Sequence, residues 1–463
     1  MGVRAPGTME AIYVAASLVT HYADNVGIAI GTLRAGERHQ GVLLGEDIPM
    51  GHKFALRHIP AGEQVIKHRA SIGYAGAHIP AGAWVHIHNC KTNLSGAPEY
   101  VYRPVATPLP PYVPARGMFA GYLRADGRVG IRNELWILPM EPCVHEIAHR
   151  LAQRAAAALG YLVPDGIRCF PHGDLFMAHP NAGGVLVLGR DGEADEGRVK
   201  FLCDDDMGAG MACLAELAAR IAAQPRTMAP LSKLVVGLQC GGSDGLCAVT
   251  ANPLLGAVSD ALIACGGSMA LALSPEMFGA ETLLMNRCRD VRVFAKTVAL
   301  INEYKGFGQA IHQSPSPDDK AGGITTLEEK ALGCVQKGGN GPVADVLAYG
   351  EQVREPGLNL LGGPGDERSA LAALAAAGCQ LILFATGGVA PLNPPVPVIQ
   401  VASNSELARR EPGWTGFNAG SLIEGVTMAS MLEGLLDKMV RVAEGERVRG
   451  EGMDIHECRD LPM

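Results

Sequence analysis

The first segment that could form a reactive site is 238–245 (LQCGGSDG), in which a cysteine and an aspartate flank two glycines directly after an apolar run. Glycines allow a ligand to approach the backbone closely, and amides at a helix start favour anions. Cys240 and Asp244 can both bind a metal. A purely structural turn is the alternative, but this combination at the end of a strand favours a functional loop.

Two basic segments lie in the first hundred residues. Segment 51–57 (GHKFALR) puts His52 beside Lys53; a histidine can bind a metal or move a proton, and a desolvated lysine can act as a base. An exposed turn before a strand explains the spacing at least as well. In segment 85–89 (VHIHN), His86 and His88 share one face of an expected strand and can reach one metal or one acid substrate. A solvated strand face is an equal alternative.

A third basic segment is 121–133 (GYLRADGRVGIRN). Arg124, Arg128 and Arg132 are spaced for bidentate binding of carboxylates. The structural alternative is a β-turn at Asp126-Gly127 with solvated arginines on both sides, which is the more common meaning of such a pattern.

The elements that must position these groups divide at 103–116 (RPVATPLPPYVPAR), where five prolines remove backbone donors and hold the chain extended. Upstream, HIPAG at 58–62 recurs at 78–82, and alternating segments follow at 64–67 and 84–88. Residues 25–33 read as a further strand. These turn and alternation signals predict a small all-β module over 1–100 and a proline-rich linker over 101–118.

The rest of the chain alternates short apolar runs with helical patterns. Strands are expected at 135–138, 185–189, 234–238, 269–273 and 381–384, and helices at 214–222, 254–264, 369–377 and 432–442. This alternation predicts an α/β fold with Rossmann-like parallel sheets covered on both faces, which we divide into 119–300 and 301–463. Ligands in such sheets bind beyond the carboxyl ends of the strands.

Bulk composition excludes several classes of protein. The formal charge of −8 and an aromatic content of 5% argue against a nucleic-acid partner. No apolar run approaches the roughly 20 residues that a membrane helix needs. The 12 cysteines are scattered, which in a chain this long favours reduced thiols in the cytoplasm. The number of subunits is open, and a homo-oligomer is compatible with the composition.

The motifs together resemble the altronate/galactarate dehydratase family. Residues 25–89 resemble its SAF-type β-clip domain through GHKFALRHIPAGEQVIKH and IPAGAWVHIHN. The large module resembles its catalytic portion through GYLRADGRVGIRN, HPNAGGVLVLG, LQCGGSDG, VTANP, SPEMFGAE and PSPDDKAGGITTLEEKALGCVQKGG. The resemblance implies removal of water from a sugar acid to give a 2-keto-3-deoxy acid. It also implies a divalent metal, usually Fe²⁺ with Mn²⁺ as the alternative.

β-Elimination needs a base, a positive centre for the developing aci-carboxylate and an acid for the leaving hydroxyl. With the resemblance, this assigns residues to three roles. The expected catalytic residues are Lys53, His52, Arg128, Arg132 and Asp244, with Lys53 or a nearby histidine as the proton carrier. The expected substrate-binding residues are Asn133, Gly241, Gly242, Ser243, Glu276 and Lys320. The expected metal ligands are His52, His86, His88, Cys143 and Cys240. We expect the site where the β-clip module folds back onto the carboxyl ends of the sheet.

Two segments depart from the family's pattern. The chain has CFPHGD at 169–174 in place of a His-x-x-Gly-Cys-Gly loop, and TGGVAP at 386–391 in place of an Arg-Gly-Ser loop. One potential metal ligand and one acid-binding arginine are therefore missing. Two alternatives stay open: a sulfolactate-type sulfo-lyase, which the family also contains, and a non-catalytic sugar-acid-binding paralogue.

Overall fold

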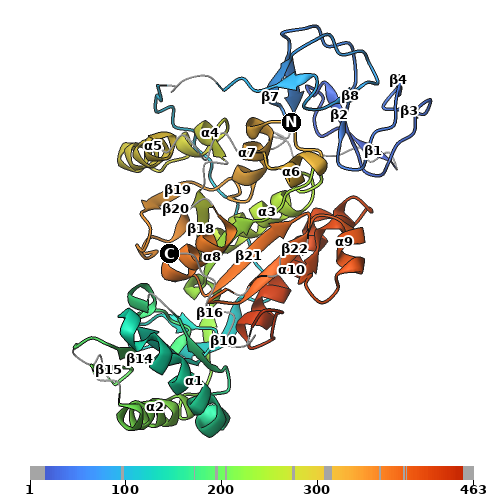
Figure 1. Ribbon diagram of the computed structural model, residues 1–463. Helices are drawn as coiled ribbons and strands as arrows, with labels where there is room; N and C mark the ends of the chain where they lie inside the picture. The colour runs from blue at the N-terminus through green and yellow to red at the C-terminus, as the bar shows by residue number, and fades with distance from the viewer. Residues whose placement is uncertain are drawn as a thin grey trace.

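The computed structural model places three parts in a row (Figure 1). A small β module lies at one end, a four-stranded sheet with two helices lies at the other, and a seven-stranded sheet with its helices lies between them. The structure describes residues 16–94, 99–170, 173–192, 197–203, 206–273, 277–306, 315–363, 366–388, 392 and 394–451.

The N-terminal module is all β, as its alternation and turns predict. Its sheets are antiparallel, with strand orders β1-β2-β5-β8, β6-β7-β9 and β3-β4. The strands are β1 (Ser17–Leu18), β2 (Val26–Ala29), β3 (Arg38–His39), β4 (Val42–Leu43), β5 (Lys53–Ala55), β6 (Gln64–Lys67), β7 (Ala70–Ala75), β8 (Trp84–Val85) and β9 (Cys90–Lys91).

The part at the opposite end is a parallel four-stranded sheet of order β13-β12-β14-β15. α1 (His145–Leu159) and α2 (Met207–Ala222) share an apolar cluster with one face of this sheet. A small antiparallel sheet, β11-β10-β16, connects it to the centre. The strands are β10 (Met118–Leu123), β11 (Val129–Gly130), β12 (Glu134–Pro139), β13 (Ile167–Cys169), β14 (Ala182–Leu188), β15 (Val199–Leu202) and β16 (Thr227–Pro230).

The central sheet is parallel throughout, with strand order β19-β20-β18-β17-β21-β22-β23. The chain first builds outward from β17 on the β18 side and then returns to add β21 on the other side. The strand order therefore reverses between β17 and β21. The strands are β17 (Val235–Cys240), β18 (Ser268–Leu273), β19 (Val343–Leu347), β20 (Gly357–Gly362), β21 (Leu381–Thr386), β22 (Val398–Ala402) and β23 (Phe417–Asn418).

Apolar side chains cover both faces of the central sheet, which explains why its strands are continuous hydrophobic runs. On one face, residues such as Leu238 pack against α3, α7 and α10 in one core cluster. On the other face, residues such as Phe384 pack against α8 and against the side of the four-stranded sheet that carries Trp136. The helices around this sheet are α3 (Ala251–Ala264), α4 (Glu281–Met285), α5 (Val291–Gly306), α6 (Pro317–Ala321), α7 (Leu327–Gln336), α8 (Glu367–Ala376), α9 (Ser405–Arg410) and α10 (Met428–Ala443). The predicted α/β class with Rossmann-like parallel sheets is confirmed.

Three expectations need correction. A division at residue 300 is wrong, because β17 and β18 lie in one sheet with β19 to β23. The linker is extended as expected, but it follows the surface of the central part, where the Tyr102 hydroxyl donates to the Cys288 carbonyl at 2.6 Å. His86 and His88 lie in a turn beyond the two-residue strand β8, because the Asn89 side chain closes that turn onto the Trp84 carbonyl.

Within the part of the chain that the structure describes, no helix has both the length and the apolar character needed to cross a membrane.

Candidate active site

A cavity of about 570 Å³ opens at the carboxyl ends of β17 and β21. Crevices of this kind form where the strand order of a parallel sheet reverses, because the loops after the two central strands diverge there. The described lining residues are Gln239, Cys240, Gly241, Gly242, Ser243, Asp244, Ser316, Asp318, Asp319, Gly322, Lys330, Glu367, Arg368, Thr386, Gly387, Gly388 and Leu392. The predicted Gly-rich loop therefore lines the cavity.

Hydrogen bonds hold the Gly-rich loop rigidly. The Gly387 amide donates to the Gly242 carbonyl at 2.8 Å, which ties together the loops after β21 and β17. One oxygen of Asp244 accepts the amides of Leu246 and Cys247, and the other accepts the Ser403 hydroxyl at 2.7 Å and the Asn404 side chain. Since both carboxylate oxygens are occupied, Asp244 shapes the loop in this conformation.

A buried carboxylate fixes the opposite wall of the cavity. Asp319 caps α6 together with Ser316, and it also accepts the Ser243 amide at 3.2 Å. Lys330 of α7 completes the arrangement with an ion pair of 2.6 Å to Asp319. The 315–339 segment thus reaches the Gly-rich loop through charged groups that no local sequence pattern singled out.

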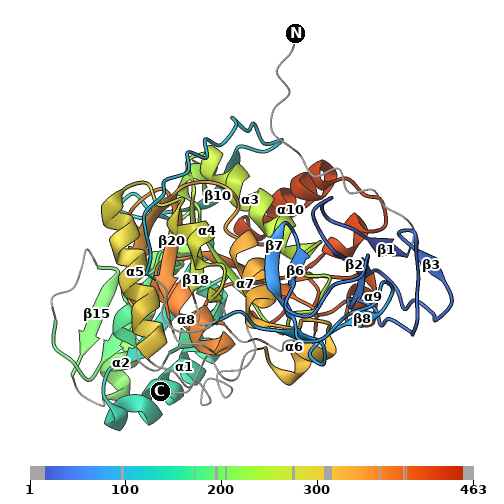
Figure 2. The same cartoon turned by 90° about the horizontal axis from the view of Figure 1, so that it is seen from above.

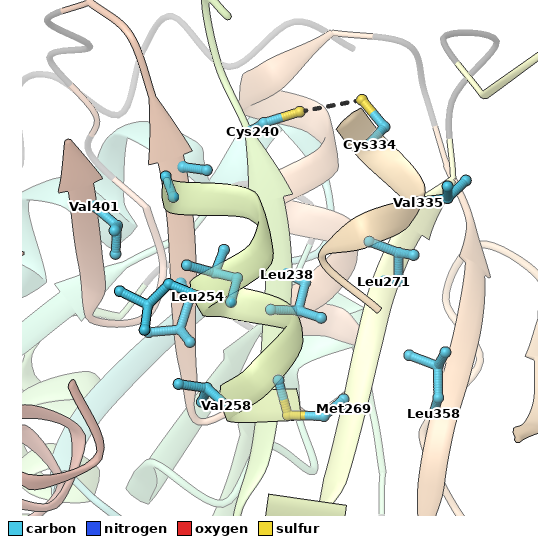
Figure 3. Packing of buried hydrophobic residues seen from close by; sticks show 14 of the residues in the cluster. Leu238, Cys240, Leu254, Val258, Met269, Leu271, Cys334, Val335, Leu358 and Val401 are labelled. Atoms are coloured by element: carbon cyan, nitrogen blue, oxygen red, sulfur yellow. Dashed lines mark hydrogen bonds between the residues drawn. The ribbon is translucent and has the colours of Figure 1, made fainter. Parts of the chain in front are cut away.

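Cys240 and Cys334 form a thiol pair at the edge of the cavity. Their sulfur atoms are 3.6 Å apart, at the end of the apolar layer between β17, α3 and α7 (Figure 3). The hydrogen bond with Cys334 lowers the pKa of Cys240 well below its ordinary value, and the charges of Lys337 and Lys330 add to this, although burial opposes it. Cys240 therefore loses its proton more readily than an ordinary cysteine.

The β-clip module docks beside the same loops, next to α7 in both views (Figure 1, Figure 2). Glycines make this approach possible, because a Cβ on Gly245 would lie 1.8 Å from the Gly51 carbonyl oxygen. A second cavity of about 220 Å³ is lined by Met50 and Gly51 together with Asp244 and Gly387. The two modules therefore meet at the carboxyl ends of the sheet.

His52, His86 and His88 gather around Trp84, and both ring nitrogens of His52 face protein groups. The Nδ1 atom of His52 accepts from the Trp84 indole at 3.1 Å, so Nε2 carries the proton and donates to the Ala321 carbonyl at 3.0 Å. Nδ1 of His86 lies 3.4 Å from the Thr325 hydroxyl, while His88 is exposed. Burial lowers the pKa of both buried histidines, to about 4 for His86, which keeps them neutral near pH 7.

Lys53 lies outside the lining of the cavity, in a buried cluster of charged groups. Its fully buried ammonium donates to the Gly323 carbonyl at 2.6 Å and to Glu329 of α7 at 2.9 Å, and Lys67 binds the same carboxylate at 2.7 Å. Burial alone raises the pKa of Glu329, but the two lysines outweigh it and hold that pKa below its ordinary value. Burial lowers the pKa of Lys53 although the Glu329 carboxylate opposes this, and Lys53 is not among the residues that line the cavity, so we interpret it as a docking residue of the β-clip.

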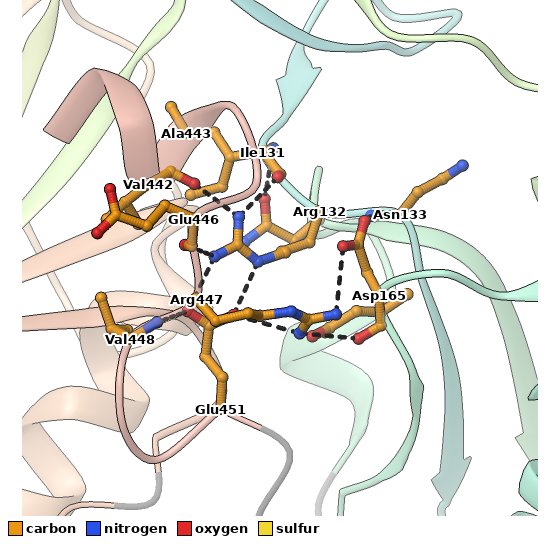
Figure 4. A network of polar contacts seen from close by, with 12 residues as sticks. Ile131, Arg132, Asn133, Asp165, Val442, Ala443, Glu446, Arg447, Val448 and Glu451 are labelled. Atoms are coloured by element: carbon orange, nitrogen blue, oxygen red, sulfur yellow. Dashed lines mark hydrogen bonds and ion pairs between the residues drawn. The ribbon is translucent and has the colours of Figure 1, made fainter. Parts of the chain in front are cut away.

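The predicted carboxylate-binding arginines lie away from the cavity. Arg132 is fully buried and forms a bidentate pair with Glu451, with both N–O distances 2.8 Å, beside the end of α10 (Figure 4). Arg128 pairs with Asp126 in the β10–β11 turn. Asn133 is buried, and its side chain accepts from Arg124 at 2.9 Å. The turn at Asp126-Gly127 is therefore present, but the solvated arginines of that alternative are not, because Arg124 and Arg132 are buried.

The remaining predictions have mixed outcomes. Gly241, Gly242 and Ser243 line the cavity as expected, whereas Lys320 is half-buried in α6 and is not among the lining residues. Glu276 lies outside the described residues. Residues that sequence reasoning missed are Asp319, Lys330, Cys334, Glu367 and Arg368. Three of them, Asp319, Lys330 and Cys334, lie in the 315–339 motif that was quoted for the family resemblance, and this motif was their only signal in the sequence.

The predicted ligands do not fit a single divalent ion. Cys143 is exposed at the start of α1, in the part opposite the β-clip, and the nitrogens of His52 are engaged with protein groups. Across the described ranges, no three His, Cys, Asp or Glu side chains are grouped so that they could hold a metal. Of the predicted set, only Cys240 lines the cavity.

Comparison with known proteins agrees with this three-part organisation. Residues 15–93 match the altronate/galactarate dehydratase SAF domain, 121–174 match the second domain of D-galactarate dehydratase/altronate hydrolase, and 231–460 match the D-galactarate/altronate dehydratase C-terminal domain. Altronate dehydratase from Escherichia coli (strain K12) is 43% identical over 94% of this chain and 97% of its own length. The chain belongs to the altronate/galactarate dehydratase family. The resemblance drawn from the motifs is thereby confirmed.

Two further members of the altronate/galactarate dehydratase family align over most of their length. Altronate dehydratase from Bacillus subtilis (strain 168) is also 43% identical, over 94% of this chain and 97% of the relative. Galactarate dehydratase (L-threo-forming) from Escherichia coli (strain K12) is 32% identical over 88% of both chains. The chain that contains the cavity between β17 and β21 therefore has all three domains of this family.

Proposed function

We propose that the protein is a hydro-lyase that removes water from a sugar acid such as altronate or galactarate and gives a 2-keto-3-deoxy acid. The observation that carries this proposal is the polar cavity at the carboxyl ends of β17 and β21, in a chain of the altronate/galactarate dehydratase family. A polyhydroxy acid needs many hydrogen-bonding groups, and the side chains of Gln239, Ser243 and Thr386 line this cavity.

The cavity also contains groups that can move protons. Elimination begins when a base removes the weakly acidic proton beside the substrate carboxylate, and the 3-hydroxyl then leaves with a proton as water. The resulting enol loses its hydroxyl proton and takes up a proton at C3, which gives the 2-keto-3-deoxy acid. Asp318 and Glu367 contribute carboxylates, and Cys240 contributes a thiol whose pKa is lowered. These three side chains replace Lys53 as the candidate proton carriers of this mechanism.

A divalent metal, Fe²⁺ or Mn²⁺, is still a prediction from the family resemblance. The proton transfers proposed for Asp318, Glu367 and Cys240 do not depend on it.

We further propose that the protein works in the reducing cytoplasm, which the free cysteines of the described residues fit.

The proposal can be tested with the full-length protein purified without oxygen, alone and with added Fe²⁺ or Mn²⁺. A panel of aldonates, aldarates and sulfolactate is offered, and 2-keto acid and sulfite are measured. We expect 2-keto acid without sulfite from at least one sugar acid, and loss of that activity in Glu367→Gln if this carboxylate carries the proton. Sulfite release would assign a sulfo-lyase. Binding of a sugar acid without turnover under every metal condition would assign a sensor.

A further inference from the structure

Cys240 and Cys334, at the edge of the cavity, are thiols that no disulfide joins in this structure. Cys240 is the last residue of β17 and Cys334 lies in α7, so the pair brings together residues 94 positions apart in the chain. The two Sγ atoms are 3.6 Å apart and point toward each other (Figure 3). A disulfide bond is about 2.05 Å long, so the two sulfurs have to approach by only about 1.5 Å to form one.

The two thiols differ in their access to small molecules. Cys240 is 6% exposed and lines the cavity of about 570 Å³, so a small solute that enters the cavity reaches its sulfur. Cys334 is 3% exposed and is not among the described lining residues of either cavity. Cys240 is therefore the thiol that a small oxidant meets first, and Cys334 lies behind it.

Positive charge near the pair favours reaction at Cys240. Lys330 and Lys337 are buried, and their charges stabilise a negative charge on the Cys240 sulfur. The thiolate is the form of a cysteine that attacks an oxidant. Cysteines that oxidise readily are accessible and often lie next to a second thiol. Cys240 has the contact with the cavity, the nearby cations and the partner thiol that this reaction needs.

We propose that hydrogen peroxide converts Cys240 and Cys334 into a disulfide that reversibly inactivates the cavity. The Cys240 thiolate attacks one peroxide oxygen, the O–O bond breaks, and hydroxide leaves, which gives a sulfenic acid at Cys240. The Cys334 thiolate then attacks the Cys240 sulfur, the S–O bond breaks, and a second hydroxide leaves. The two hydroxides take up the two thiol protons. Two thiols thereby lose two electrons, and one peroxide is reduced to two molecules of water.

The inhibitory effect of this disulfide rests on the proposed function. A disulfide sulfur has no proton to donate, and it is too weak a base to accept one near neutral pH. Oxidation therefore removes Cys240 from the three candidate proton carriers of the cavity. The new bond also holds the Cys240 side chain against α7 and away from a bound substrate. A thiol reductant restores both cysteines, so the inhibition is reversible.

The first test identifies the bond itself and needs no turnover. The full-length protein is treated with hydrogen peroxide, alkylated and digested, and its peptides are weighed. We expect a Cys240–Cys334 cross-linked peptide, lighter by two hydrogen atoms than the two separate peptides, which dithiothreitol removes. Cys334→Ser should instead accumulate a sulfenic acid at Cys240, which dimedone traps. The matched control is Cys213→Ser, which removes a thiol of α2 in the part opposite the β-clip and should form the cross-link as the wild type does.

The second test measures dehydratase activity in the same samples, each relative to its own untreated protein. Because a general acid or base contributes about 10²- to 10⁴-fold, fully oxidised wild type and Cys213→Ser should lose at least about 100-fold in kcat, and dithiothreitol should restore it. Inactivation of Cys334→Ser should resist dithiothreitol once Cys240 reaches the sulfinic acid.

The outcomes separate this inference from the proposed function. Oxidised wild type without the Cys240–Cys334 peptide would overturn the inference. A cross-link that forms without loss of activity would overturn its inhibitory role. A wild type that forms the cross-link but turns over no sugar acid would contradict only the proposed function.

Discussion

The placement of Lys53 leads to a prediction that separates docking from proton transfer. Replacing Lys53 with Met keeps the apolar stem and removes two hydrogen bonds, to Gly323 and Glu329. Glu329 still accepts from Lys67 at 2.7 Å and from the Thr325 amide at 2.8 Å. The loss of unfolding free energy should therefore be smaller than the loss expected for a buried charge without any partner. We expect the free energy of unfolding to fall by about 2–4 kcal/mol.

This loss is large enough to measure by thermal unfolding. At about 2.1 cal/mol/K per residue, a chain of 463 residues unfolds with an entropy near 1 kcal/mol/K if it unfolds as one unit, so the midpoint should fall by about 2–4 °C. The catalytic rate of the folded Lys53→Met enzyme should stay close to that of the wild type. A general base, in contrast, would cost about 10² to 10⁴ in kcat without any loss of stability.

Lys67→Met provides the matched control, because Lys67 is equally buried and binds the same carboxylate. If Lys53 serves docking, the two variants should lose similar stability and keep similar kcat. The reasoning is refuted if Lys53→Met unfolds at the wild-type temperature with kcat reduced at least about 100-fold while Lys67→Met remains active.

Three other predictions follow from buried or reactive groups. Arg132→Met removes the bidentate partner of Glu451, which keeps Arg447 at 3.4 Å, so urea unfolding should show a loss of about 2–4 kcal/mol with KM unchanged; full stability would contradict the ion pair. Burial raises the pKa of Glu134 from 4.5 to about 7. The protonated carboxyl therefore adds about 3 kcal/mol to the free energy of unfolding below pH 4.5, and this stabilisation should disappear as pH rises through 7. Glu134→Gln should flatten that pH dependence, and an unchanged slope would refute the assignment. Iodoacetamide should modify Cys240, which lines the cavity, before the buried Cys379, whose pKa burial raises; peptide mass spectrometry showing the reverse order would contradict the lowered pKa.

The sequence predicted features that depend on local patterns. The apolar run before Cys240 and the glycines after it identify a strand end and a loop, and both lie at the cavity. The predicted division of the α/β region failed because strand pairing joins segments far apart in the chain. Residue type alone could not separate Arg132, which is buried in an ion pair, from Arg368, which lines the cavity.

The same limit applies to the β-clip. Lys53 has the residue type of a base and a plausible position after a loop, but its partner Glu329 lies 276 residues later. Only the fold shows that both side chains are buried at one interface. The place of Asp319 and Lys330 in the cavity wall is likewise a product of tertiary structure. Both residues lie far along the chain from the Gly-rich loop, and Asp319 reaches the Ser243 amide only in the folded protein.

The pair between Arg132 and Glu451 also constrains how the chain can mature during synthesis. The two residues are 319 positions apart, so Glu451 is translated long after Arg132. The four-stranded sheet can form early, because domains fold as they emerge from the ribosome. Arg132, however, must wait for its counterion until the 319 positions that separate it from Glu451 have been translated. A chain that stops a few residues short of Glu451 would carry a finished sheet with an unpaired guanidinium, a defect that cellular quality control can recognise.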